Sequence, residues 1–251
     1  MKSVTAGPKQ NHLLAALPEI VLARLLPLLQ SRTFSVGEIL IPANVKQRYV
    51  YFPTTCIALL SYGVSAIATP RTWPVGNEGI VGITAFLGES TADSQAEIQV
   101  AGEGFQLDAQ LFRTEFKLGG GLQLLLLRYV EILITQASQL VICEHSHTVN
   151  QRVCRFLLRA FDRVPNDTIT TTQARIASLM GVRRESVTEA ASRLQADSVI
   201  DYSRGHITLL DRPELEHQSC ECYGIIKSAF EGLRLKSHVK KTRRRHEIQM
   251  T

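Results

Sequence analysis

The sequence predicts an α+β protein in which an N-terminal antiparallel β-roll is followed by a long helix and a C-terminal winged helix-turn-helix. Three observations support this prediction. Short β-favouring runs separated by Gly, Pro and Asn fill residues 33–108. A long helical segment with a heptad-like apolar stripe follows. Two short helical patterns around a glycine, and then two short strands, complete the ordered part of the chain.

The composition indicates a water-soluble protein with a basic C-terminal half. The chain has 251 residues, of which 45% are hydrophobic and 20% charged, so it can bury a sizeable core. Residues 1–150 carry 10 Lys/Arg against 11 Asp/Glu, a net charge of −1, whereas residues 151–251 carry 18 against 12, a net charge of +6. The basic half indicates a polyanionic partner.

No pattern in the sequence indicates an enzyme. A P-loop, a Gly-x-Ser-x-Gly elbow, a dinucleotide fingerprint and a set of metal ligands are all missing. We therefore predict no catalytic residue and no cofactor. The most apolar run, LQLLLLRYVEILI, contains Arg128 and Glu131, and we expect it to be too short and too charged to cross a bilayer.

The five cysteines are scattered and odd in number, which favours a reducing compartment. With no signal peptide recognisable, we predict a cytoplasmic protein. Cys143, His145 and His147 are close in sequence, but alternate residues of a helix do not share a face, so we predict no metal site. A redox role for Cys220 and Cys222 is open but weakly indicated.

Four segments are predicted along the chain. They are a β-roll over 1–114, a dimerisation helix and hinge over 115–148, a winged helix-turn-helix over 149–233 and a basic, disordered tail over 234–251. Residues 11–30 predict a short helical entry to the roll.

The long helical segment runs from Phe116 to about Cys143 and is interrupted only by the triple glycine at 119–121. So long an apolar stripe favours a second helix as its partner, and we predict a homodimer. Packing against the chain's own roll is the alternative. The predicted dimer residues are Leu122, Leu126, Tyr129 and Leu133.

The stretch TTTQARIASLMGVRRESVTEAASRL predicts two short helices that cross steeply. The turn between them needs a residue free to take a positive φ, which Gly181 supplies. The predicted core of this motif consists of Ile176, Ala177, Gly181 and Val187. The following VIDYSRGHITLL predicts two strands around Ser203–Gly205, which would form a wing beside the helices.

In helix-turn-helix proteins the N-terminal end of the second helix enters the major groove. Arginine can bond bidentately to guanine, and glutamate can accept from the cytosine amino group. We predict base reading by Arg184, Glu185, Thr188 and Glu189, and phosphate contacts by Arg183, Ser186, Thr172 and Arg204. The alternative is a solvated helix face on which Glu185 and Glu189 repel each other.

Over nearly its whole length the chain resembles the Crp/Fnr family of bacterial transcription regulators. The strongest match is GVRRESV, which is similar to the family's Gly-x-x-Arg-Glu-Thr/Ser-Val at the start of its recognition helix. VYFP (50–53) and GNEGIVGITAFLG (76–88) resemble stretches of the roll in some members. A further reader in many members, an arginine one helical turn after the glutamate, is replaced here by Glu189.

The resemblance implies a cyclic-nucleotide-binding-like jelly roll, a homodimer, a palindromic site on double-stranded DNA and RNA polymerase as a further partner. Members that bind cyclic nucleotide hold the ribose with a Gly-Glu turn and the phosphate with a later arginine. Here Ile83 follows Gly82, and Asp93 precedes Ser94 where the arginine is expected, so a phosphate would be repelled. We predict a degenerate pocket at Gly82, Ile83, Asp93 and Ser94, with an unknown small-molecule effector.

Two functions therefore remain. The first is a dimeric, sequence-specific DNA-binding transcription regulator. The second is a ligand-binding signalling module whose winged helix mediates protein–protein contacts.

Overall fold

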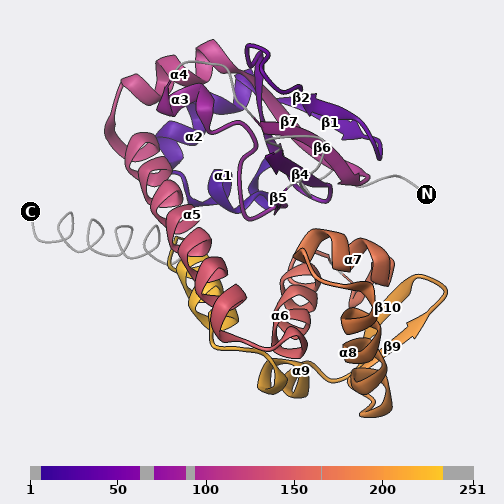
Figure 1. Cartoon of the computed structure of the whole chain (residues 1–251). Helices are drawn as coiled ribbons and strands as arrows, with labels where there is room; N and C mark the ends of the chain where they lie inside the picture. Colours follow the sequence, from indigo (N-terminus) through magenta and orange to yellow (C-terminus); the bar gives the residue numbers. More distant parts are fainter. Residues whose placement is uncertain (1–6, 63–70, 89–93, 165, 234–251) are drawn as a thin grey trace, which may run out of the picture. The chain divides into compact units, whose positions relative to one another are not determined.

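The structure, a computed structural model, divides into two compact units (Figure 1). The first comprises residues 1–66, 72–132 and 229–251, and the second comprises 67–71 and 133–228. The residues described are 7–62, 71–88, 94–164 and 166–233. The predicted tail at 234–251 and Asp93 lie outside them. The segment boundaries predicted at 114, 148 and 233 stay predictions.

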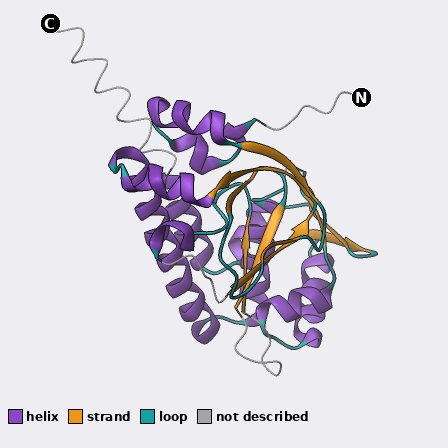
Figure 2. Cartoon of the chain, turned by 90° about the horizontal axis from the view of Figure 1, so that it is seen from above, coloured by secondary structure: helices purple, strands orange, loops and turns teal. Residues whose placement is uncertain are grey.

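Two antiparallel sheets build the first unit, with strand orders β1-β7-β3 and β2-β6-β4-β5. In Figure 2 these strands curve past one another. Their bounds are β1 Gln30–Phe34, β2 Ile39–Ile41, β3 Tyr49–Pro53, β4 Ile57–Tyr62, β5 Arg71–Val75, β6 Ser94–Val100 and β7 Gly102–Asp108. The predicted antiparallel roll is confirmed. Sequence reasoning missed β1, which is mostly polar, and β5, which contains Pro74.

The expected helical entry is broken into short pieces. They are η1 Pro8–Gln10, α1 His12–Ala16, α2 Glu19–Leu25 and η2 Leu26–Leu28. Pro18 disfavours helical geometry at the residue before it, so it begins α2 rather than continuing α1. The buried Asn11 side chain donates to the carbonyls of Pro53 and Gly79 at 2.9 and 2.8 Å, and it also caps α1. This one amide therefore anchors the entry helices to the roll.

The predicted single segment from 116 to 143 is two helices. After the short α3, Thr84–Leu87, the chain forms α4, Ala109–Lys117, and then α5, Gly120–Ser146. The break between α4 and α5 follows from Gly119 and Gly120, whose φ values of 76° and 72° lie in the left-handed region. Phe116 thus belongs to α4, and α5 extends past Cys143.

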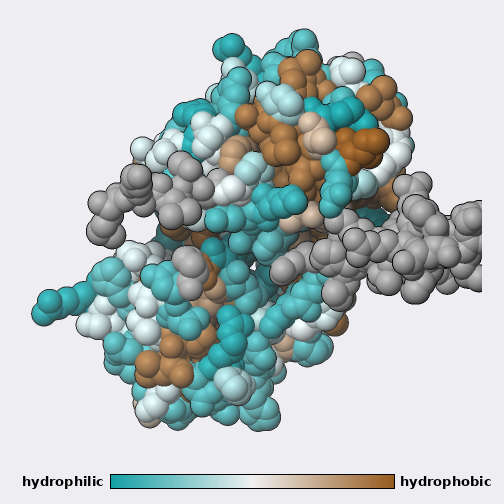
Figure 3. Space-filling view, turned by 180° about the vertical axis from the view of Figure 1, so that it is seen from behind, coloured by the Kyte–Doolittle hydropathy of each residue, from teal (hydrophilic) through white to brown (hydrophobic). Residues whose placement is uncertain are grey.

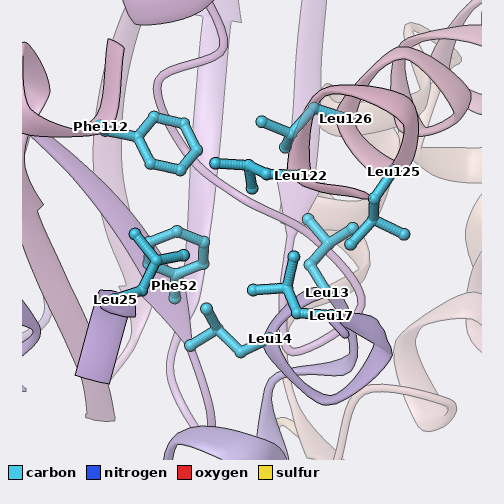
Figure 4. Close-up of a pocket in the computed structure, with 9 residues that line it drawn as sticks. All are labelled: Leu13, Leu14, Leu17, Leu25, Phe52, Phe112, Leu122, Leu125 and Leu126. Atoms are coloured by element: carbon cyan, nitrogen blue, oxygen red, sulfur yellow. The ribbon is translucent and has the colours of Figure 1, made fainter. Parts of the chain in front are cut away.

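One face of α5 packs inside the first unit. Leu122, Leu125 and Leu126 point toward the entry helices and β3 around an apolar gap of only about 10 Å³ (Figure 4). Further along, the Tyr129 hydroxyl accepts from the backbone N–H of Ile80 at 3.4 Å. A Cβ atom on residue 79 would lie only 2.2 Å from the Tyr129 hydroxyl oxygen, so the contact requires glycine at this position.

This packing corrects three of the four predicted dimer residues. Leu122, Leu126 and Tyr129 are at most 3% exposed in the single chain, so the alternative, packing against the chain's own roll, describes them. Leu133 is half-buried, and its role in a dimer stays a prediction. The sequence pattern was ambiguous because a helix packed on a roll and a helix packed on a partner show the same apolar period.

A second apolar stripe lies on the exposed side of α5. Leu127, Ile134 and Val141 recur at intervals of seven residues, are 48–63% exposed, and are joined by the exposed Leu124. By length and composition alone, the whole of α5 is long and apolar enough to cross a membrane, because it extends beyond the run LQLLLLRYVEILI that was judged too short. Core helices of water-soluble proteins pass the same test.

The second unit is built around a small helical domain with a three-stranded sheet of order β8-β10-β9. Its elements are α6 Val149–Phe161, β8 Thr168–Thr170, α7 Gln173–Met180, α8 Arg184–Ala196, β9 Ile200–Ser203, β10 His206–Leu209 and α9 Arg212–Gln218. Residues 222–233 form a further helix. The predicted winged helix-turn-helix is confirmed, whereas β8 and α9 were not foreseen.

In the view of Figure 3 the surface of the first unit shows a broad hydrophobic area, and that of the second is mainly hydrophilic.

Replacing Leu126 by alanine is expected to lower the free energy of unfolding by about 2–5 kcal/mol, because a fully buried side chain leaves a cavity. Urea unfolding followed by circular dichroism measures this change. The matched control is Leu111→Ala on α4, where the leucine is half-exposed and the loss should stay below about 0.5 kcal/mol. Equal losses in both variants would show that α5 does not pack on the roll.

Candidate nucleic-acid interface

The turn between α7 and α8 is made by a left-handed glycine. Gly181 has φ 65° and ψ 35°, and the N–H of Val182 donates to the carbonyl of Ala177 at 3.1 Å. This hydrogen bond is part of a Schellman motif, which ends α7 and redirects the chain. From the adjacent α6, Arg152 donates to the Met180 carbonyl at 3.2 Å and so satisfies another acceptor at the end of α7.

A single apolar core fixes the angle between the two helices. Ile176 and Ala177 on α7, and Val187, Ala190 and Leu194 on α8, are buried together with α6 and the strands of the wing. Small side chains at Ala177 and Ala190 let the helices approach closely. Of the four residues predicted to form the core of this motif, Ile176, Ala177 and Val187 are buried apolar side chains, and Gly181 forms the turn.

The wing, β9 with β10 and the turn that joins them, closes through a two-residue hairpin. Arg204 and Gly205 both have positive φ, 50° and 83°, which identifies a type I′ turn. The Gly205 carbonyl accepts from the N–H of Thr171 at 2.9 Å. Because Thr172 caps α7, the tip of the wing lies beside the N-terminus of that helix.

The N-terminus of α7 is also tied to the exposed face of α8. The Thr188 hydroxyl donates to the Gln173 side-chain oxygen at 2.7 Å. Gln173 was not foreseen as a site residue, because a glutamine at a helix start carries no distinctive sequence signal. Thr172, Arg204 and Thr188, predicted separately, are thus linked through the first residues of α7.

Arg183 and Arg184 are exposed and have no side-chain partner in the described part of the chain. Arg183 is the N-cap of α8 but supplies no capping hydrogen bond, so the first N–H groups of α8 lack a side-chain cap. Glu185 is exposed in the first turn, and Ser186 is half-buried beside it. Two free guanidinium groups therefore flank an uncapped helix N-terminus, a combination suited to anions.

Glu189 has a partner that sequence reasoning missed. Its carboxylate pairs with Arg193, one turn along α8, and both side chains are more than half exposed. The expected repulsion between Glu185 and Glu189 is thus offset by an attractive i,i+4 pair. Such an exposed pair contributes only about 0.3–0.5 kcal/mol, so either side chain can exchange its partner for a ligand.

The roll turn predicted to be a degenerate pocket is occupied by a side chain of the chain itself. The Gln47 amide donates to the carbonyls of Gly82 and Tyr49, both at 2.9 Å, and accepts from the Thr84 hydroxyl at 2.6 Å. A Cβ on Gly82, which has φ 101°, would lie 1.8 Å from the Gln47 nitrogen. Ile83 is the N-cap residue of α3, and Ser94 is buried in β6. Sequence reasoning missed Gln47, which lies far from this turn in sequence.

Comparison with known proteins tests the fold and the C-terminal domain. Residues 151–218 match the profile of the Crp-like helix-turn-helix domain. A search of curated proteins found no match. Among solved structures, FixK2 from Bradyrhizobium japonicum aligns with a TM-score of 0.61 and 15% identity, over 76% of this chain and 98% of its own.

The C-terminal part of the chain therefore contains a Crp-like helix-turn-helix domain. A Crp/Fnr-family protein from Eubacterium rectale aligns with a TM-score of 0.60 and 17% identity, over 82% of this chain and 96% of its own. A CRP-family transcriptional regulator from Thermus thermophilus gives 0.54 and 18%, over 75% and 96%. These low identities show a shared fold, and the matched domain confirms the predicted resemblance to a family of transcription regulators.

Gly181→Ala is expected to cost about 1–2 kcal/mol of stability, because the space is open but an alanine is strained at positive φ. Thermal unfolding measures the loss. Gly224→Ala is the matched control, since Gly224 lies in the helix 222–233 with open space around it. That change should be neutral or stabilising by up to about 1 kcal/mol. A loss at Gly224 as large as that at Gly181 would contradict the role of backbone strain.

Proposed function

We propose that this protein is a Crp/Fnr-type regulator, a homodimer that regulates transcription by binding a palindromic site on double-stranded DNA. The observation that carries the proposal is the pair of unpartnered arginines at the uncapped start of α8, within a Crp-like helix-turn-helix domain. Two-fold symmetry requires two half-sites, about 34–36 Å apart along the DNA. RNA polymerase is a further partner in this proposal, and the protein acts in the cytoplasm.

The exposed face divides into base readers and phosphate contacts. Arg184, Glu185, Thr188 and Glu189 project from α8 and read base edges, with Glu189 leaving Arg193 to accept from a base amino group. Arg183, Ser186, Thr172 and Arg204 hold phosphates. Thr172 and Arg204 suit one backbone strand because the wing tip is bonded next to the start of α7.

Dimerisation in this proposal uses the exposed stripe of α5 rather than the residues first expected. Leu124, Leu127, Ile134 and Val141 follow a heptad spacing and are 44–63% exposed in the single chain. Burying such a stripe against its symmetry mate is the common way for a long helix to remove apolar surface from water.

The roll does not bind a cyclic nucleotide in this proposal. Gln47 already bonds the Gly82 carbonyl and the Thr84 hydroxyl at this turn, and Ile83 stands where members that bind cyclic nucleotide carry the glutamate that holds the ribose. Effector control, if exerted through the roll, therefore uses a different small molecule that need not displace Gln47. The alternative function, a signalling module with a protein-binding winged helix, leaves the free guanidinium groups of Arg183 and Arg184 unexplained.

Selection from a random duplex library is expected to return a palindrome, against which arginine variants can be measured. Arg184→Ala should lose about 1–3 kcal/mol of discrimination at one base position in each half-site. Arg183→Ala should weaken binding to all sequences about equally and reduce the salt slope by about one phosphate contact. Fluorescence anisotropy at several salt concentrations measures both effects. A uniform loss in both variants would reject the division into readers and positioners, and absence of binding to any duplex would reject the proposed function.

Ile134→Glu is expected to convert the dimer to a monomer, because it places two like charges in a dry helix interface. Analytical ultracentrifugation measures the change. Operator affinity should fall by roughly 100-fold or more, since the two half-sites are no longer bound by one linked molecule. The control Ile20→Glu, at an exposed isoleucine of α2, should leave the dimer intact. If Ile134→Glu stays dimeric, the interface lies elsewhere.

A further inference from the structure

A cluster of three cysteines and one histidine lies in the second unit, outside the proposed DNA-binding face. Cys143 is in the last turn of α5, His147 follows that helix, and Cys220 and Cys222 follow α9. The ligand atoms of all four residues lie within 4.8 Å of one another. The three thiols are almost completely buried, and the histidine side chain is 11% exposed.

The distances within the cluster fit a tetrahedron around one metal ion. Two sulfurs bonded at about 2.3 Å to a tetrahedral zinc ion lie about 3.8 Å apart, and a sulfur and a nitrogen lie about 3.5 Å apart. The Cys143 and Cys220 sulfurs are 3.5 Å apart, and the Cys222 sulfur is 3.7 Å from Nδ1 of His147. Free thiols can pack in a core without four ligand atoms converging at these spacings. The arrangement therefore favours a bound metal ion.

The histidine is oriented as a metal ligand would be. Its Nδ1 faces the sulfurs, while Nε2 lies 3.2 Å from a carboxylate oxygen of Glu221. A ligating histidine commonly donates its second ring N–H to a carboxylate, which fixes the ring and raises its basicity. Glu221 lies between Cys220 and Cys222 in the sequence, so one short segment supplies two sulfurs and the supporting carboxylate.

A positive charge acts on the cluster from α6. The Arg155 guanidinium interacts electrostatically with Cys143. Three thiolates around a divalent cation would carry one net negative charge, and the Arg155 guanidinium is placed to offset it.

We propose that Cys143, His147, Cys220 and Cys222 bind one structural zinc ion. All four coordination positions belong to side chains, which is typical of structural rather than catalytic zinc, and a Cys₃His set is a common one. The site replaces the expectation that no metal binds near Cys143. That expectation treated Cys143, His145 and His147 as alternate residues that do not share a face, whereas Cys143 and His147 are four residues apart, about one helical turn, and do share one.

The position of the site indicates what the ion does. His147 immediately precedes α6, and Cys220 follows α9, so the ion joins the two ends of the segment that contains the winged helix. A metal clip that closes so long a loop reduces the entropy of the unfolded chain. The ion would therefore hold the last turn of α5 in place where the chain enters the DNA-binding domain. The proposal stands independently of the proposed DNA site.

The test measures the metal content of the full-length chain, purified without a histidine tag under reducing conditions and reconstituted with zinc. We expect about one zinc ion per chain by mass spectrometry of the metal. Substitution by Co²⁺ should give the visible d–d bands of a tetrahedral site and a near-ultraviolet thiolate charge-transfer band. Cys222→Ser and His147→Gln should reduce both signals to near zero, whereas the controls Cys56→Ser and His145→Gln should leave them unchanged.

A second measurement does not depend on whether the variants fold. In the wild-type chain, bound zinc should protect Cys143, Cys220 and Cys222 from an alkylating agent, and a chelator should expose them and lower the melting temperature. Failure of the reconstituted wild-type chain to retain metal would overturn the proposal. Zinc content that is unchanged in both cluster variants would also overturn it. A disulfide between Cys143 and Cys220 that persists when the protein is purified under reducing conditions would do the same.

Discussion

The packing of Tyr129 over Gly79 is the contact on which the rest of α5 depends. The hydroxyl reaches the Ile80 N–H only because Gly79 has no side chain, and this fixes the rotation of the helix about its axis. With the inner face set, the opposite face is set as well. It carries the exposed leucine, isoleucine and valine residues that follow a heptad spacing. The surface proposed to meet a second copy of the chain therefore follows from a contact within the first.

The C-terminal end of α5 carries a second functional contact, within the second unit. Cys143 is buried in the last turn of the helix, and its thiol faces the 219–222 segment, with its sulfur 3.5 Å from that of Cys220. Had Cys143 faced outward, Cys220 and Cys222 would have no third sulfur. One helix therefore supplies the core contact, the exposed stripe and a ligand of the proposed zinc site.

The DNA-binding face obeys a more local constraint. The left-handed Gly181 and the positive φ values at the wing turn position two elements with backbone geometry alone, and a common apolar core holds them together. The side chains proposed to meet DNA remain outside that core. Arg183 and Arg184 cost little in stability because they are solvated, and they keep their full charge for a partner. Stability and recognition are thus carried by different residues of the same two helices.

The sequence by itself determined the order of the three main parts, the roll, the long helix and the winged helix-turn-helix, because alternation, helical period and turn glycines are local signals. It also identified the helix that carries Arg184 and Glu185. It did not determine which face of α5 meets the roll, since an apolar stripe has the same period whatever covers it. Nor did it reveal Gln47 at the Gly82 turn, or Cys143 beside Cys220. Those pairs are 35 and 77 residues apart, and only tertiary packing brings such distant side chains into contact.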